Sequence, residues 1–139
     1  MKRHKLVASV CAFVCVLTLV IPAFAVTPRA SEQIRSYMMD VIVTEGAVNI
    51  EFSIVGKNIM DKIGCQSIYL YERVAGKWEY VSSRSEDSYG MSNTKRSSHA
   101  NTITFNGSAG VEYKVIVTVF AENDAGRDSR SQTFYVTGK

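Results

Sequence analysis

The sequence has 139 residues, which is enough for one domain, and Lys plus Arg outnumber Asp plus Glu by 16 to 13. That excess lies wholly in the first five residues, in Lys2, Arg3 and Lys5, so the rest of the chain is balanced at 13 bases and 13 acids. A balanced chain without a basic run argues against a nucleic-acid-binding protein and against attraction to an anionic membrane surface.

The first 25 residues have the pattern of a secretory signal peptide. A basic start is followed by an apolar segment, residues 6–20, and by the small-x-small exit of residues 23–25. We expect cleavage after Ala25 and a secreted, extracellular mature chain without a membrane segment. An uncleaved anchor is the alternative, because residues 6–25 are about long enough to span a bilayer.

Cys65 is the only cysteine of the expected mature chain, so an intramolecular disulfide is excluded. It follows Gly64 and precedes an apolar run, and we expect a small buried hydrophobic side chain. An intermolecular disulfide or a reactive thiol is the alternative.

A polar lead-in, residues 26–36, precedes one domain that we expect to span residues 37–139. Residues 37–44, rich in Met and β-branched side chains, predict the first strand. Residues 48–55 predict the second, because their apolar residues alternate with polar ones in the manner of a half-buried strand. Gly56 is expected to end it, and residues 57–64 to form an irregular connection that folds back onto the core.

Residues 67–74 and 77–82 predict the third and fourth strands. Ala75 and Gly76 between them indicate a tight two-residue hairpin turn. The polar segment 82–100 is expected to be a long loop or to contain an irregular edge strand.

Residues 101–105, 111–121 and 131–137 predict the last three strands, with turns at 106–108 and 123–126. About seven short strands with frequent turn signals, and no segment with a helical stripe, predict an all-β fold, an antiparallel β-sandwich.

The closing segment, residues 111–136, resembles the last hairpin of immunoglobulin-like and fibronectin type III domains. The shared pattern is a tyrosine, Tyr113, near the start of a long alternating strand, followed by Ala121, Asn123 and Gly126. This resemblance implies a sandwich of that type and a tyrosine-corner role for Tyr113, whose hydroxyl would bond to backbone upstream. The missing disulfide pair and the late tryptophan depart from the pattern.

A second resemblance covers nearly all of the mature chain. It is carried by residues 60–64 (MDKIG), the segment 91–99, the Gly110-x-x-Tyr113 turn and residues 128–130 (DSR). These motifs are similar to a family of small secreted proteins of Gram-positive, mainly clostridial, bacteria that is defined only as a domain of unknown function. The resemblance implies export and a bacterial source, and it supplies no activity.

The most specific binding signal is aromatic. A turn at Ala75 and Gly76 would pair Arg73 with Trp78, Tyr71 with Tyr80 and Leu70 with Val81. Alternation then places Ile68, Leu70 and Val81 on the core face. The opposite face would form an exposed patch, a candidate site for a glycan or a protein partner, made of Tyr69, Tyr71, Arg73, Trp78 and Tyr80. Alternatively, these rings cover the sandwich edge or pack beneath residues 82–100.

Signals for catalysis and for metal binding are weaker. His99, with Asp87, Ser97 and Ser98 nearby in sequence, is a candidate hydrolase centre, but it lacks a nucleophile-elbow motif. A solvent-facing or capping histidine is the simpler interpretation. Soft ligands for Cu(I) would be Met60, Cys65, Met91 and His99. Oxygen ligands for calcium would be Glu122, Asn123, Asp124 and Asp128, with Arg127 among them.

We therefore expect a secreted, non-catalytic interaction module without metal or cofactor, which binds an extracellular glycan or protein through the aromatic hairpin. A second candidate site is the end of the sandwich that carries residues 57–64 and 122–128. The alternative functions are a purely structural extracellular component, which would self-associate, and a small hydrolase centred on His99.

Overall fold

The computed structural model describes residues 32–139, so the expected signal peptide and residues 26–31 of the lead-in lie outside the described part. The described residues form six strands and no helix, and the all-β prediction is confirmed. The strands are β1 (Ile34–Thr44), β2 (Ala47–Val74), β3 (Lys77–Ser85), β4 (Ser92–Asn106), β5 (Glu112–Asn123) and β6 (Gly126–Thr137).

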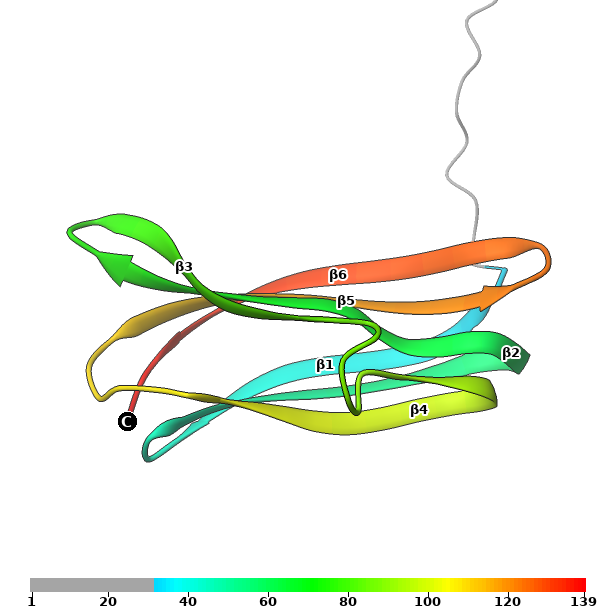
Figure 1. Cartoon of the computed structure of the whole chain (residues 1–139), viewed down its shortest axis with the longest axis horizontal. Coiled ribbons are helices and arrows are strands. Elements are labelled where there is room, and N and C mark those ends of the chain that lie inside the picture. Colours follow the sequence, from blue (N-terminus) through cyan, green and yellow to red (C-terminus); the bar gives the residue numbers. More distant parts are fainter. Residues whose placement is uncertain (1–31) are drawn as a thin grey trace, which may run out of the picture.

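All six strands belong to one antiparallel sheet in which β2 is the common partner. The main order is β1-β2-β5-β6, and β3 and β4 also pair with β2. The first part of β2 pairs with β1 and β4, and its second part pairs with β3 and β5. Because β2 serves both parts, the sheet curls into two facing layers, with β1 and β4 below and β3, β5 and β6 above (Figure 1).

The length of β2 accounts for the difference between six strands and the predicted seven. The predicted strands 48–55 and 67–74 and the connection between them are one strand of 28 residues. Gly56 does not end it, because an irregularity opposite β4, between Val55 and Met60, absorbs the extra residues while pairing resumes beyond it. Met60 is 1% exposed, which confirms that this segment folds onto the core.

Gly64 lies where β2 passes from one layer to the other. Its φ is +155°, and a Cβ there would lie 2.5 Å from the Ser92 Cα and closer still to the Met91 carbonyl oxygen. Only glycine allows this approach of β2 to the start of β4.

The polar segment 82–100 contains the predicted edge strand and is not a loop throughout. β3 continues to Ser85, and β4 begins at Ser92, before the expected start at residue 101. Most side chains of the early part of β4 are exposed, so this part lacks the apolar alternation that marks a half-buried strand. Two further starts are early, since β1 begins at Ile34 and β6 at Gly126.

The core fills the space between the layers with the alternating residues that the sequence predicted. From the lower layer come Val48, Ile50, Phe52 and Ile54, and from the upper layer Ile68, Leu70, Tyr113, Val115, Val117 and Val119. The predicted tyrosine-corner bond is confirmed, because the Ser108 N–H donates to the Tyr113 hydroxyl oxygen at 2.8 Å.

Cys65 belongs to the same core, which confirms the interpretation of a buried hydrophobic side chain. Its side chain is fully buried, and burial raises the pKa of the thiol to about 12. The thiol lies 3.3 Å from the Thr118 carbonyl oxygen, to which it can donate a weak hydrogen bond. The reactive-thiol alternative is wrong, because a buried and protonated thiol is a poor nucleophile.

Candidate functional site

The predicted hairpin between β2 and β3 is present. Ala75 and Gly76 have φ values of 51° and 78°, the backbone of a two-residue turn with both central residues left-handed. Arg73 pairs with Trp78, which confirms the register next to the turn. Tyr71 likewise pairs with Tyr80.

Farther from the turn, the predicted pairing of Leu70 with Val81 is wrong. Leu70 pairs with Ser82, because the register shifts by one residue between Leu70 and Tyr71. This bulge turns Val81 out of the core, where it is 42% exposed.

The predicted aromatic side chains lie together on the outer surface of the upper layer. Ile68 and Leu70 are fully buried, so the residues that alternate with them along β2 point outward. The partners opposite them on β3 point the same way. All five residues of the predicted patch, Tyr69, Tyr71, Arg73, Trp78 and Tyr80, are therefore on one face.

The neighbouring strands β5 and β6 extend this patch with two residues that the sequence reasoning did not include, Lys114 and Tyr135. Tyr71 is opposite Lys114, which in turn is opposite Tyr135. One row thus crosses four strands, from Tyr80 on β3 to Tyr135 on β6. We call the combined set the aromatic face: Tyr69, Tyr71, Arg73, Trp78, Tyr80, Lys114 and Tyr135.

Ring contacts tie the aromatic face together. The Trp78 and Tyr135 rings lie 5.7 Å apart between centroids with a tilt of 47°, and the Tyr71 and Tyr80 rings lie 6.2 Å apart edge to face. The Lys114 ammonium lies between these pairs, 4.6 Å from the centroid of Tyr71 and 5.4 Å from that of Trp78. Such contacts hold exposed rings in fixed orientations.

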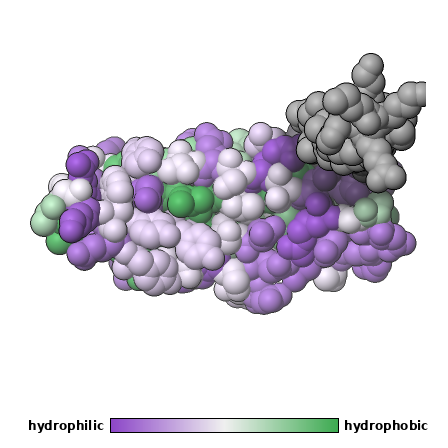
Figure 2. Space-filling view, turned by 90° about the horizontal axis from the view of Figure 1, so that it is seen from above, coloured by the Kyte–Doolittle hydropathy of each residue, from purple (hydrophilic) through white to green (hydrophobic). Residues whose placement is uncertain are grey.

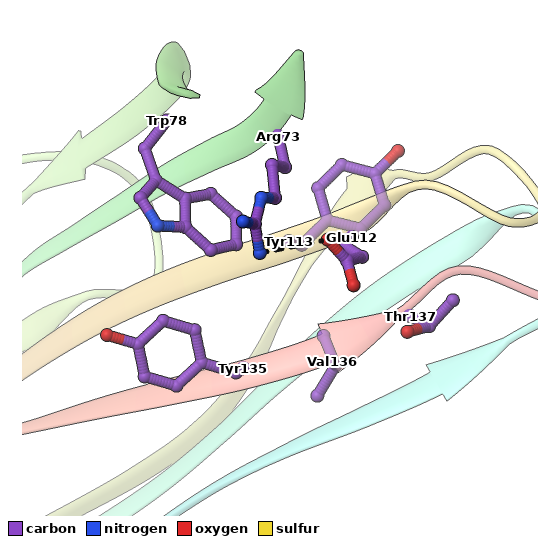
Figure 3. A pocket seen from close by; sticks show the side chains of 7 residues that line it. All are labelled: Arg73, Trp78, Glu112, Tyr113, Tyr135, Val136 and Thr137. Atoms are coloured by element: carbon purple, nitrogen blue, oxygen red, sulfur yellow. Dashed lines mark hydrogen bonds and ion pairs between the residues drawn. The ribbon is translucent and has the colours of Figure 1, made fainter. Parts of the chain in front are cut away.

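A cleft of about 450 Å³ opens beside these rings at the hairpin end of the layer. Figure 3 shows Trp78 and Tyr135 on one side of it and Arg73 and Glu112 projecting beside them, with Thr137 farther along β6. Arg73 and Glu112 form an ion pair at 3.5 Å, and each is about half exposed. The cleft therefore combines flat apolar rings with charged donor and acceptor groups.

The aromatic face stays open to solvent. Tyr69 is 42% exposed, Tyr80 60% and Tyr135 66%, whereas Tyr71 and Trp78 are half-buried by their neighbours. Figure 2 views this layer from outside: pale side chains of intermediate hydropathy lie between the hairpin tip and the middle of the layer, and strongly hydrophilic ones gather toward the other end. Residues 82–100 do not cover the rings of Tyr69 and Tyr80, which remain exposed, and Glu86 of that segment is held at the far end by Lys62 and Arg127.

That far end, where residues 57–64 and 122–128 meet, carries the second predicted site. Lys62 pairs with Glu122 in the β2–β5 ladder, so the two segments are brought together as expected. Glu86 forms ion pairs with Lys62 at 2.9 Å and with Arg127 at 2.9 Å. The Arg127 guanidinium carbon lies 4.1 Å from the centroid of the buried Phe120 ring.

The hydrogen bond from Arg127, with that from Lys62, lowers the pKa of Glu86 to about 2. Because these charges are directed at one another, we interpret this end as a structural ion network that closes over Phe120. Arg127 also pairs with Glu122 at 3.1 Å, which places a cation among the residues considered for calcium.

His99 is on β4, where its Nε2 lies 2.8 Å from the Gly90 carbonyl oxygen and its ring packs against Phe52. Asp87, the acid considered as its partner, bonds instead to Lys62 at 2.9 Å. Within residues 32–139, no group of three or more His, Cys, Asp or Glu side chains is arranged to hold a metal ion. Nor does this part of the chain contain a helix long and apolar enough to cross a membrane.

Comparison with known proteins gives a distant structural likeness. No protein-family model and no curated protein matches the sequence. The fold is similar to the crystal structure of Spo0M, a sporulation control protein from Bacillus subtilis, with 16% identity and a TM-score of 0.44 over 75% of this chain. The chain spans about half (49%) of the length of that protein.

Proposed function

We propose that this protein is a secreted, non-catalytic binding module whose ligand is a glycan lying along the aromatic face. In this proposal, residues 1–25 direct export and the curled sheet is a sandwich of the immunoglobulin-like type. The protein would belong with the small secreted proteins of clostridial bacteria that its motifs resemble. The observation that carries the proposal is the cleft in which the half-buried Trp78 ring and the exposed Tyr135 ring stand beside the Arg73–Glu112 pair.

The chemistry of this cleft suits a sugar. A sugar ring has an apolar face of C–H groups, which can lie flat on Trp78 or Tyr135, and a rim of hydroxyl groups. The guanidinium of Arg73 offers planar donors to such hydroxyls, and the carboxylate of Glu112 offers acceptors. Both side chains are about half exposed, so they can contact a ligand while their strands stay paired in the sheet.

The size of the cleft also favours a glycan over a folded protein. About 450 Å³ lies within the usual range of small-ligand sites, about 300–1,000 Å³. A stable protein interface needs about 800 Å² of surface on each partner, and Lys and Glu are normally depleted there. Lys114 and Glu112 both stand on or beside the aromatic face, which fits a polar ligand better.

Affinity electrophoresis and calorimetry of the purified protein against a panel of soluble polysaccharides test the proposal. We expect binding of at least one polysaccharide, and a loss of about 2 kcal/mol or more for Trp78→Ala and for Tyr135→Ala. Tyr89→Ala is the matched control, because Tyr89 is a fully exposed tyrosine (101%) outside the aromatic face. Equal losses in all three variants, or none, would refute the proposal.

The same samples separate the alternative functions. A structural component would self-associate, which sedimentation velocity detects. Neither the unmodified protein nor Trp78→Ala would then bind any polysaccharide of the panel. A hydrolase would release reducing ends from a polysaccharide, and His99→Ala would abolish that release with the thermal midpoint retained.

A further inference from the structure

We propose that the glycan bound by the aromatic face is anionic and that Lys114 recognises its acidic group; this inference rests on the proposed function and names its ligand class. Lys114 is half-buried at the middle of the face, in the row that crosses from Tyr80 to Tyr135. Its ammonium lies above the ring of Tyr71 and close to that of Trp78, so its position is set by the rings on which a sugar would stack.

The charge of Lys114 is not balanced by a carboxylate. The ion pairs among residues 32–139 use Lys62, Arg73, Lys95 and Arg127 as their cations, and Lys114 is in none of them. Cation–π contacts with two rings leave a formal positive charge at the surface. An incoming anion that replaces water at this ammonium gains a charge-assisted hydrogen bond.

The nearby acids do not cancel this site. Glu112 is on the same face of β5, but Arg73 already pairs with it at 3.5 Å. Glu72 lies opposite the buried Tyr113 and therefore points to the other side of the layer, and its hairpin partner Glu79 does the same. The cleft and its rim thus carry Arg73 and Lys114 against Glu112, a local excess of one positive charge in an expected mature chain that is balanced overall at 13 bases and 13 acids.

Ring geometry and charge together select the ligand. A cationic ligand of the kind held by aromatic cages is disfavoured, because it would be repelled by Lys114 and Arg73, whose cations already lie near the Tyr71 and Trp78 rings. A neutral glycan can stack on Trp78 and Tyr135 but leaves Lys114 without a partner. A glycan whose rings carry carboxylate or sulfate groups can satisfy the rings and Lys114 together.

The test compares matched probes by calorimetry at low salt. Polygalacturonate carries a carboxylate on every ring, and its fully methyl-esterified form has the same backbone without the charge. Dextran sulfate provides a sulfate probe with dextran as its neutral reference, and hyaluronate is a second carboxylate probe. We expect an acidic probe to bind at least about tenfold more tightly than its neutral counterpart, the value of one charge-assisted hydrogen bond.

Lys114→Gln should remove most of that preference and reduce the salt dependence of binding, while retaining the affinity for the neutral counterpart. Arg96→Gln is the matched control: it removes one exposed positive charge from β4 in the other layer and should change neither affinity. Whether the carboxylate arms or the sulfate arm bind tighter identifies the acidic group.

Three results would overturn the inference, and they are distinguishable. Equal affinity for acidic and neutral probes, still abolished by Trp78→Ala, would refute the anionic ligand and leave the proposed function standing. Binding of none of the probes at millimolar concentration would refute both. Tighter binding of a single-stranded oligothymidylate than of any glycan would replace a sugar with a nucleic acid, whose bases also stack on aromatic rings.

Discussion

Replacing Gly64 with alanine tests whether β2 really passes between the layers as one continuous strand. The substitution introduces a Cβ that meets the backbone of Met91, just before β4, and of Ser92, its first residue, and these backbone atoms cannot rotate away. It also forces alanine to a φ of +155°. The unfavourable backbone conformation costs about 1–2 kcal/mol, and the overlap with fixed backbone atoms costs about 1–3 kcal/mol more.

We therefore expect Gly64→Ala to lower the free energy of unfolding by about 3 kcal/mol, and the thermal midpoint by about 15 °C for a domain of this size. Gly46→Ala is the control, because Gly46 also has a positive φ of 74° but nothing lies within 4 Å of the added Cβ. Its midpoint should fall by only about 5 °C. If urea and thermal unfolding give the same loss for both variants, the close approach of β2 to β4 is wrong.

Three further substitutions probe the turn, the corner and the ion network. Ala75→Asn should stabilise the protein by about 0.5–1 kcal/mol in urea unfolding, since asparagine tolerates the φ of 51° better than alanine; a destabilisation would contradict the turn geometry. Tyr113→Phe should cost about 1–2 kcal/mol, because the Ser108 N–H loses its acceptor, and an unchanged midpoint would refute the corner bond. The pKa of Glu86 is lowered to about 2, so its contribution to stability is present above its unfolded pKa of about 4.5 and disappears as the pH falls toward 2. With Glu86 partly screened by solvent, Glu86→Gln should cost about 1–2 kcal/mol at pH 7 and only a small part of that at pH 2, where the carboxyl is about half protonated in the folded state; an equal loss at both pH values would contradict the network.

The strands that face the core on one side were predictable from the sequence. Val48–Ile54 and Tyr113–Val119 alternate with period two, and every second residue, from Val48 to Ile54 and from Tyr113 to Val119, is buried. The continuity of β2 was not predictable, because irregular pairing near Gly56 interrupts the alternation. For the early part of β4 the sequence left open a loop or an edge strand for a related reason, since an exposed edge strand has no apolar face to reveal it.

The site residues on the β2–β3 hairpin were predicted from the sequence, but those on the β5–β6 hairpin were not. The turn at Ala75 and Gly76 fixed the pairing that gathers Tyr71 and Trp78 on one face. The turn predicted at residues 123–126 sets the register of β5 and β6 in the same way and places Lys114 opposite Tyr135. What the sequence lacked was the pairing of β2 with β5, strands far apart along the chain, which brings the two hairpins side by side.

The most direct test of the central claim is where a glycan contacts the protein. Two-dimensional NMR of ¹⁵N-labelled protein, titrated with polygalacturonate fragments, resolves the single indole N–H of Trp78 together with every backbone amide. The account predicts that the Trp78 indole signal and the amides of Arg73, Lys114 and Tyr135 shift together, with those of β1 and β4 unmoved. Shifts confined to the Glu86 end or to the lower layer, with the Trp78 signal unchanged, would contradict it.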